Sequence, residues 1–255
     1  ASFKNLIHKI PAQDEHINAK EVYRHSRWIT KNILEEVRLG GAINSKVAKA
    51  AVSDCVQSIL SNPDAMLWMS KIREQHNYTA EHSLNVCVLA ITFGRYLGMK
   101  ELELNQIGLC GMLHDVGKMQ VPSDVLNKPG ELNEEEWQVM QSHANYGRDL
   151  LMSTPDIYSG AIDTAYAHHE REDGSGYPRG LKGGAIPSYA KIISIVDAYD
   201  AMTSERCYGK PKTSYAALKT INDNAGTQFD RNLSMQFIKC IGFYSAGCLV
   251  EMKLG

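Results

Sequence analysis

Residues 78–97 read YTAEHSLNVCVLAITFGRYL, and this stretch decides the fold class. Its apolar residues recur at helical spacing along one face: Leu84, Val88 and Ile91, with Leu89 and Tyr96 beside them. Such spacing is typical of a helix that buries its apolar side. We therefore expect a helix over residues 78–97 that ends near Gly98.

Further helices are indicated on both sides of this stretch, whereas strand patterns are scarce. The next helix carries its apolar rhythm on Leu104, Ile107, Gly111 and His114. We expect Gly117 to stop that helix, and Asn133 with Glu136 matches a capping box at the start of another. Other predicted helices cover residues 156–169, 189–202, 214–225 and 230–241. With Ser188 as a further cap, the pattern predicts an all-α fold.

Two segments differ from these helices. Five glycines lie near Pro178 between residues 170 and 187, which predicts a long ordered loop or a lid. The first seventy residues are helical in pattern but more polar. We divide the chain into an N-terminal helical linker or regulatory segment (1–70), a main domain (71–245) and a C-terminal tail (246–255). Because the chain lacks an initiator Met and ends abruptly, we expect a piece of a longer protein.

Composition limits the classes of function. The 255 residues contain 27 Lys and Arg against 29 Asp and Glu, so the formal charge of -2 gives no broad basic surface for DNA. The most apolar stretches, 84–93 and 192–196, are too short to cross a bilayer. Six scattered cysteines lack the spacing of a zinc site or a redox dithiol. We therefore expect reduced thiols and a cytoplasmic location.

Nine histidines are the unusual part of the composition, because histidine is often used for metal binding and proton transfer near neutral pH. Four have no ligand-like spacing and are expected to be ordinary: His8, His16, His25 and His76. The other five are His82, His114, His143, His168 and His169. A single histidine in a helix is more often structural than a ligand, so the hypothesis of a metal site depends on the whole set.

Two of these histidines are followed at once by another potential ligand. Asp115 follows His114 in a mostly apolar helix, where an unpaired buried carboxylate is costly. A divalent cation would pair with Asp115, but an aspartate that caps a turn explains the dipeptide equally well. For His168 and His169 the alternative is a surface pair, although the apolar face before them favours burial. Neighbouring residues diverge on a helix, so either pair can share an ion only where its helix ends.

Two further carboxylates, Asp197 and Asp200, fall on the same helical face as Ile193 and need partners. We expect Asp197 to bind an ion and Asp200 to bond to the backbone. Five imidazoles with Asp115 and Asp197 exceed the needs of one metal and suit two ions that share a bridging aspartate. Such nitrogen and oxygen ligands suit iron, manganese or zinc, and a pair of these ions favours phosphate-ester hydrolysis.

The motifs resemble those of the HD-GYP phosphodiesterases of the HD superfamily. Residues 114–118, HDVGK, are similar to the HDxGK motif, and residues 168–178, HHEREDGSGYP, are similar to HHExxDGxGYP. Further matching pieces are His82-Ser83, KPGEL at 128–132, His143 with Gly147, and DAYDAMTS at 197–204. The resemblance covers residues 70–245. It implies an HD-type helical bundle with a glycine-rich GYP loop, preceded here by an N-terminal helical extension.

The resemblance also implies a catalytic centre with two divalent ions, for which iron or manganese is expected and zinc also fits. One ion would be held by His82, His114, Asp115 and Asp197, and the other by His143, His168 and His169, with Asp115 bridging. A metal-bound hydroxide would attack phosphorus, and Lys118 would assist at the leaving oxygen. The substrate would be cyclic di-GMP, cleaved to pGpG or GMP, or cyclic GMP-AMP.

Three residues match substrate-binding positions of that family. Arg206 begins a sequence similar to its R-x-Y motif, although Cys207 stands at the usual proline. Lys210 lies one position later than the family's basic residue. Tyr177 of the GYP loop either contacts the ligand or anchors the loop.

The departures from the family's pattern concern the number of ions and the activity. Some members hold a third ion through a Glu at the position of Tyr78, and Glu81 points elsewhere on the helix, so we expect two ions. The alternatives to a phosphodiesterase are a cyclic-dinucleotide sensor or interaction module and an HD enzyme for another nucleotide. The N-terminal helices are expected to serve a homodimer or a signalling partner.

Overall fold

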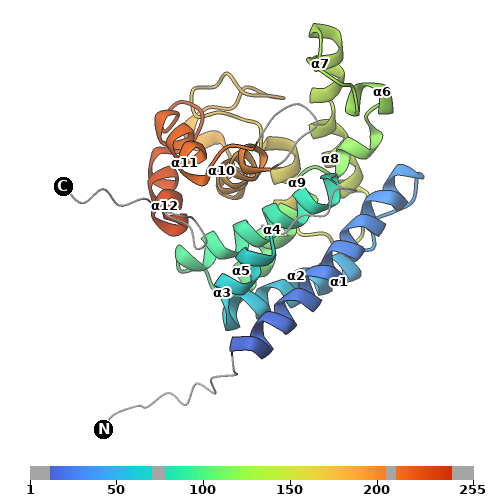
Figure 1. The fold of residues 1–255 in the computed structure, drawn as a ribbon. Coiled ribbons are helices and arrows are strands. Elements are labelled where there is room, and N and C mark those ends of the chain that lie inside the picture. The colour runs from blue at the N-terminus through green and yellow to red at the C-terminus, as the bar shows by residue number, and fades with distance from the viewer. Residues whose placement is uncertain (1–11, 71–77, 205–210, 243–255) are drawn as a thin grey trace, which may run out of the picture.

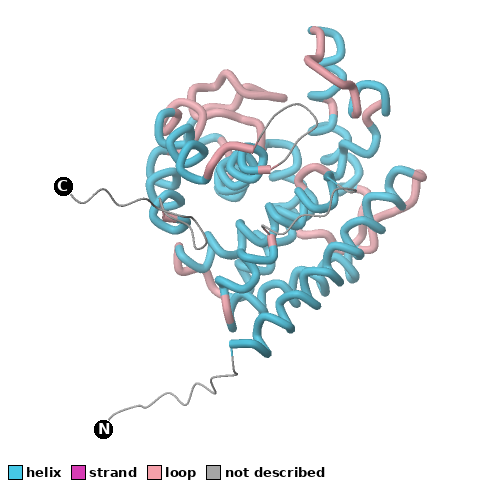
Figure 2. The backbone as a smooth tube through the Cα atoms, in the orientation of Figure 1, coloured by secondary structure: helices cyan, strands magenta, loops and turns pink. Residues whose placement is uncertain are grey.

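The computed structural model describes residues 12–70, 78–204 and 211–242, and all regular elements in these ranges are helices (Figure 1 and Figure 2). The first five are α1 (Ala12–Arg38), α2 (Ser45–Ser61), α3 (Pro63–Met69), α4 (Tyr78–Tyr96) and α5 (Glu101–Leu113). Next come η1 (Val116–Gln120), α6 (Ser123–Leu126), α7 (Glu134–Gln141), α8 (His143–Met152) and α9 (Ser159–Ala167). The last are η2 (Gly183–Ala185), α10 (Ser188–Thr203), α11 (Ser214–Asp223) and α12 (Arg231–Ile241). The predicted all-α fold is confirmed.

Helices α4 and α5 lie at the centre because their apolar residues point in more than one direction. Val88 and Ile91 of α4 belong to a cluster that also contains residues of α1, α2 and α3. Val86 and Phe93 of the same helix belong to a second cluster with α10, α11 and α12. A helix that is apolar all round is expected inside a helical body. The prediction of one apolar face is therefore incomplete, and it is wrong for Tyr96, which is 46% exposed.

The described part of the N-terminal segment packs directly on these central helices. Ile33 and Val37 of α1 and Ile59 of α2 are buried in the same cluster as Val88 of α4. Figure 1 shows α1 and α2 lying along α4 and α5. The helices before residue 70 therefore belong to the same packed body as the region that carries the motifs. The predicted tail, 246–255, lies outside the described residues.

The helix termini agree only in part with the predicted ones. Asn133 and Glu136 form the predicted capping box, each side chain accepting the other's backbone N–H at 2.8 Å. That helix breaks at Ser142, so His143 begins a new helix, α8. Ser188 is not a cap, because Pro187 occupies the cap position of α10 and Ser188 is its first helical residue.

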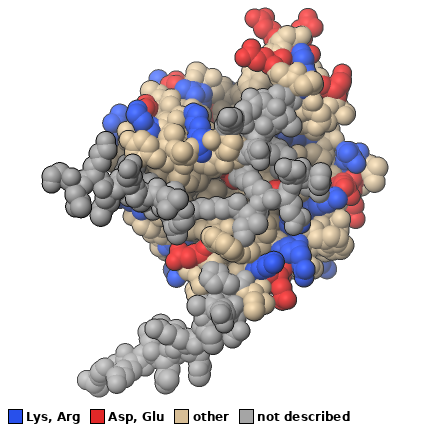
Figure 3. Space-filling view, viewed as in Figure 1, with Lys and Arg blue, Asp and Glu red and all other residues tan. Residues whose placement is uncertain are grey.

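Charges of both signs are distributed over the surface. On the face seen in Figure 3, basic and acidic side chains alternate, and acidic ones gather at the tip that carries α7. The first turn of α7 contains Glu134, Glu135 and Glu136, where negative charge stabilises a helix N-terminus. Among the described helices, none combines the length and apolarity needed to span a bilayer.

Candidate metal centre

The structure brings the seven predicted metal ligands to one place. They come from α4, from the ends of α5 and α9, from the start of α8 and from α10. Their ligand atoms form three groups whose members lie within 4.8 Å of one another: Asp115, His143, His168 and His169; His82, His114 and Asp115; and His114, His168 and Asp197. Because Asp115 belongs to two of these groups, its carboxylate links them.

The two adjacent pairs meet the condition that a helix must end where both members face one site. Helix α5 ends at Leu113, before Gly117, which was the residue expected to stop it. At φ -106° and ψ 10° Asp115 has left the helix, and its Oδ2 lies 3.3 Å from Nε2 of His114. In the same way α9 ends at Ala167, immediately before His168.

Gly117 serves close packing instead of stopping the helix. A Cβ at this position would lie 2.0 Å from the carbonyl oxygen of His143 and 2.4 Å from the backbone nitrogen of Gly147. Only glycine lets η1 approach the first turn of α8 so closely. This contact helps to place Oδ1 of Asp115 3.5 Å from Nε2 of His143.

Three of the histidines are oriented by backbone carbonyls of their own or the preceding helical turn. Nδ1 of His114 and of His143 lies 2.7 Å from the oxygens of Gly111 and Met140, and Nδ1 of His168 lies 3.1 Å from that of Thr164. Because a carbonyl can only accept, Nδ1 carries the proton in each ring. Nε2 therefore keeps its lone pair, which is the form that binds a metal.

These lone pairs face one another and a carboxylate in the buried interior. Nε2 of His143 and of His168 are 3.5 Å apart, and each is 3.5 Å from Oδ1 of Asp115. Nε2 of His114 and Oδ1 of Asp115 are buried and have no hydrogen-bond partner. Buried acceptors of this kind are costly unless a donor or a cation satisfies them. The arrangement therefore fits divalent cations held by nitrogen and oxygen.

His82 is held differently, because its partners are carboxylates of α10. Its Nε2 lies 3.0 Å from Oδ1 of Asp197, and its Nδ1 lies 2.8 Å from Oδ2 of Asp200. We expected Asp200 to bond to the backbone, but the described partners of its carboxylate are side chains. Besides the contact with His82, it accepts hydrogen bonds from Asn85 and Ser204. Sequence reasoning missed that Asp200 supports His82, although its position one turn after Asp197 was the available signal.

Burial and nearby charges shift the protonation of the cluster in opposite directions. Burial lowers the pKa of His82, but the hydrogen bonds that it donates to Asp197 and Asp200 outweigh burial and raise the pKa to about 9. Burial dominates at His143 and lowers its pKa to about 3. It also lowers the pKa of His169, together with the neighbouring histidines. In the metal-free protein His82 is protonated near neutral pH, whereas His143 and His169 are neutral.

The two carboxylates of the cluster stay ionised in spite of their burial. Burial raises the pKa of Asp115, but the Lys118 ammonium and His114 outweigh it and hold the pKa well below its usual range. Burial also raises the pKa of Asp197, but the hydrogen bond with His82 outweighs burial, so the pKa lies below its usual range. Nζ of Lys118 lies 2.5 Å from Oδ2 of Asp115, and its side chain is 26% exposed. Lys118 therefore stands between the buried carboxylate and solvent.

The GYP loop is anchored beside the histidines. Tyr177 stacks on His169, with ring centroids 4.7 Å apart, and donates its backbone N–H to the His169 carbonyl. The buried carboxylate of Glu170 accepts the backbone N–H groups of Arg179 and Leu181 at 2.9 and 2.8 Å. Sequence reasoning missed this role of Glu170, for which the signal was an acidic residue between the histidine pair and the glycine-rich segment.

The far end of the same loop is fixed to the connection between α11 and α12. The backbone N–H of Asp173 donates to Thr227 at 2.9 Å, and Lys191 of α10 pairs with Glu172 at 2.7 Å. Of the two alternatives, an ordered loop or a lid, these contacts favour the ordered loop.

Several predicted residues lie outside the described residues or away from the cluster. Arg206 and Lys210 are outside the described residues, as is the side chain of Tyr78. Glu81 is paired with Arg27 of α1 at 3.0 Å. Of the four histidines expected to be ordinary, His25 is exposed and stacks with Trp28, and the side chains of the other three are not described.

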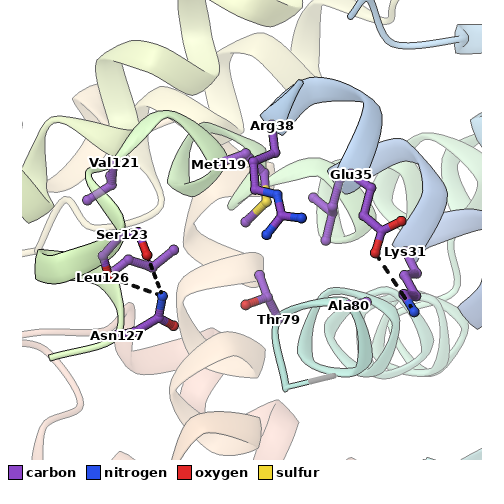
Figure 4. A pocket seen from close by; sticks show the side chains of 11 residues that line it. Lys31, Glu35, Arg38, Thr79, Ala80, Met119, Val121, Ser123, Leu126 and Asn127 are labelled. Carbon is purple, nitrogen blue, oxygen red and sulfur yellow. Dashed lines mark hydrogen bonds and ion pairs between the residues drawn. The ribbon is translucent and has the colours of Figure 1, made fainter. Parts of the chain in front are cut away.

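A pocket of about 550 Å³ lies between α1, α4, η1 and α6 (Figure 4). Lys31, Glu35 and Arg38 of α1 line one side, and Figure 4 shows the Arg38 side chain directed into the space between α1, α4 and η1. Thr79 of α4 and Met119 of η1 also line the pocket, and Figure 4 shows Met119 next to Arg38. Among the described residues, none of the cluster's histidines or aspartates lines this pocket.

An all-α body with a buried histidine–aspartate cluster at the ends of its central helices defines the class of protein. Comparison with known families agrees: a family model described as HD domain matches residues 57–233. The chain belongs to the HD domain family, and the predicted kinship with the HD-GYP group is confirmed.

Relatives with named activities cover the same region. The chain is 32% identical over 247 residues to a cyclic di-GMP phosphodiesterase of Pseudomonas aeruginosa, covering 97% of this chain and 59% of that protein. It is 35% identical over 156 residues to a 3'3'-cGAMP-specific phosphodiesterase of Vibrio cholerae, covering 61% of this chain and 30% of that protein. The chain thus spans less than two thirds of the length of these relatives.

A solved structure shares the fold. The HDG"Y"P protein Bd1817 from Bdellovibrio bacteriovorus superposes with a TM-score of 0.75 at 17% sequence identity, covering 91% of this chain and 74% of that chain. At this identity the likeness concerns the fold, and it extends over most of the chain.

Proposed function

We propose that this chain is a metal-dependent phosphodiesterase that hydrolyses a cyclic dinucleotide, either cyclic di-GMP or cyclic GMP-AMP. The observation that carries the proposal is the buried carboxylate of Asp115, whose two oxygens face different histidines. Oδ1 lies 3.5 Å from Nε2 of His143 and of His168, and Oδ2 lies 3.3 Å from Nε2 of His114. A carboxylate in this position suits a bridge between two divalent ions, the arrangement used to cleave phosphodiesters.

The residues divide into two ligand sets around that bridge. One ion would be held by His82, His114, Asp115 and Asp197, and the other by Asp115, His143, His168 and His169. A set of imidazoles and carboxylates without thiolate fits iron or manganese, and zinc also fits. When bound, the ions would supply an activated water and stabilise negative charge on the phosphate oxygens.

Lys118 and the loop residues would act directly on the substrate. The ammonium of Lys118 lies beside Asp115 and is partly exposed, so it can donate a proton to the leaving oxygen and neutralise the charge that forms there. Tyr177 lies against His169 at the edge of the centre, where it can contact a base or ribose. We assign Arg206 to phosphate binding, with Lys210 as a weaker candidate, by their positions in the sequence.

A single-turnover assay tests this function. Metal-depleted protein is loaded with Mn²⁺ and mixed, in excess over the nucleotide, with cyclic di-GMP or cyclic GMP-AMP in separate reactions, and linear products are separated by chromatography. We expect hydrolysis of one or both to pGpG or GMP. Tight binding of both nucleotides without any product would contradict the proposal and favour the sensor.

The role of Lys118 is tested in the same assay. Lys118→Ala should lower turnover by about 100-fold or more with metal content unchanged, because it removes a proton donor. The matched control is Lys219→Ala, which removes an exposed lysine of α11. Turnover by Lys118→Ala equal to that of the control would remove Lys118 from the mechanism.

A further inference from the structure

A line of buried hydrogen bonds connects the N-terminal helix α1 to the metal centre. The hydroxyl of Tyr23 on α1 donates to Oδ1 of Asn85 on α4 at 2.6 Å. Nδ2 of Asn85 donates to Oδ1 of Asp200 on α10 at 3.3 Å. The other oxygen of Asp200 lies 2.8 Å from Nδ1 of His82, whose Nε2 faces Asp197. Three helices therefore contribute to the orientation of one ligand.

The direction of each bond in this line is fixed by chemistry. A phenol that donates to the amide oxygen of Asn85 leaves the amide NH₂ free to donate to Asp200. Asp200, as a carboxylate, accepts from both Asn85 and His82, so Nδ1 of His82 keeps its proton, and an ion that replaces the proton on Nε2 finds that nitrogen already directed into the centre. Tyr23, Asn85, His82 and Asp200 are each less than 10% exposed, where such bonds strengthen one another.

A second contact holds the same part of α4 to the same helix. Arg27 follows Tyr23 by one turn of α1, and it pairs with Glu81, the residue before His82, at 3.0 Å. Tyr23 and Arg27 thus contact α4 on both sides of His82. Helix α1 lies before residue 57, where the match to the HD domain begins, so these contacts come from outside the family's common region.

We propose that α1 sets the affinity of the metal centre for the ion beside His82, and that Tyr23 is the positioning residue through which it does so. The inference rests on the metal centre proposed above and adds its regulation. A movement of α1 relative to α4 that separates Tyr23 from Asn85 frees the Asn85 amide to turn. Asp200 then loses a donor, His82 loses its fixed orientation, and the ion is bound less tightly. A signal that moves α1 would therefore change the fraction of protein that carries an ion beside His82.

Mn²⁺ titration of the metal-depleted protein tests this without a turnover assay, with free Mn²⁺ followed by electron paramagnetic resonance. Wild type should show two binding steps, and His82→Ala should identify one of them by abolishing it. Tyr23→Phe, which removes only the hydroxyl, should weaken that step by about fivefold, because losing an outer partner of a metal-binding histidine costs at least about tenfold and Tyr23 lies two hydrogen bonds beyond that partner, Asp200. The other step should change by less than about twofold on the same reasoning.

The control and a second variant separate positioning from general stability. Thr30→Val removes another buried hydroxyl of α1, one that bonds to the backbone of Ser26, and it should leave both steps unchanged. Asn85→Leu breaks the line at its next bond and should weaken the same step as Tyr23→Phe. In an Asp200→Asn background, Tyr23→Phe should have no additional effect, because the line is already broken.

The outcomes distinguish this inference from the function on which it rests. Wild-type Mn²⁺ affinity in both Tyr23→Phe and Asn85→Leu, or an equal loss in Thr30→Val, would overturn the role of Tyr23 while leaving the metal centre intact. So would a full additional loss when Tyr23→Phe is combined with Asp200→Asn. A wild-type protein that binds no Mn²⁺ would contradict the metal centre itself.

Discussion

The candidate metal centre has two halves that are built in different ways: an α4/α10 half with His82, His114 and Asp197, and an α8/α9 half with His143, His168 and His169. In the α4/α10 half, His82 is oriented by the carboxylate of Asp200 from another helix. In the α8/α9 half, His143 and His168 are oriented by backbone carbonyls three or four residues earlier in the chain. Local helix geometry therefore orients His143 and His168, as it does His114, whereas the orientation of His82 depends on the packing of distant helices. A movement of a distant helix can therefore change metal binding more readily in the α4/α10 half.

The same contrast holds for protons in the metal-free protein. The carboxylates around His82 raise its pKa to about 9, so that half contains a proton where an ion would bind. Burial lowers the pKa of His143 to about 3, so in the α8/α9 half this ring is neutral and its Nε2 lone pair faces Asp115. Without metal, His82 is stabilised by an ion pair, whereas Nε2 of His114 and Oδ1 of Asp115 are buried acceptors without a hydrogen-bond partner.

Removing the residue that joins the halves should have the largest effect. Asp115→Ala should lose both ions and lower hydrolysis by about 1000-fold or more, because bound ions supply several kcal/mol of stabilisation in the reaction. His143→Ala should lose one ion and is the matched comparison. Metal analysis and single-turnover hydrolysis measure both effects. Full hydrolysis by Asp115→Ala would show that the centre described here does not carry the reaction.

Raising the pH should separate the halves in the metal-free protein. The pKa of His82 is about 9 in the folded state against 6.5 as its ordinary value, so its protonated form stabilises the fold. That contribution, about 3 kcal/mol, is complete below pH 6.5 and is lost as the pH rises through 9. Urea unfolding between pH 6 and 10 should show this loss in wild type and not in His82→Asn. Parallel pH curves for the two proteins would refute the assignment.

A smaller effect should come from the support of His82 alone. Asp200→Asn should weaken one Mn²⁺ step by about 10- to 100-fold, the usual cost of losing the carboxylate partner of a metal-binding histidine. The α8/α9 half has no equivalent substitution, because its supporting groups are backbone carbonyls. Asp163→Asn, on the exposed side of α9, is the control and should bind Mn²⁺ as wild type does. Equal weakening of both steps by Asp200→Asn would contradict the division into halves.

Local patterns predicted the fold and the membership of the cluster. The HDVGK and HHEREDGSGYP segments each lie where a helix ends, so both members of each adjacent pair can face one site, as the sequence indicated. The meeting of the two segments was implied by the resemblance to the HD-GYP family. The all-α class followed from helical periodicity, and the capping box at Asn133 was predicted and is confirmed.

Features that depend on distant contacts could not be predicted. His82 and Asp200 are 118 residues apart, and Tyr23 and Asn85 are 62 apart, so no local pattern links them. Gly117 was interpreted as a helix stop because a glycine forced by backbone contact with another helix has the same signature in sequence.

The central claim is that one buried aspartate joins two metal positions, and a metal count tests it most directly. Protein purified without oxygen should contain two divalent ions per chain, and Asp115→Ala none. A ratio near three per chain that falls on substitution of Tyr78, or a wild-type chain that retains no metal, would contradict the account.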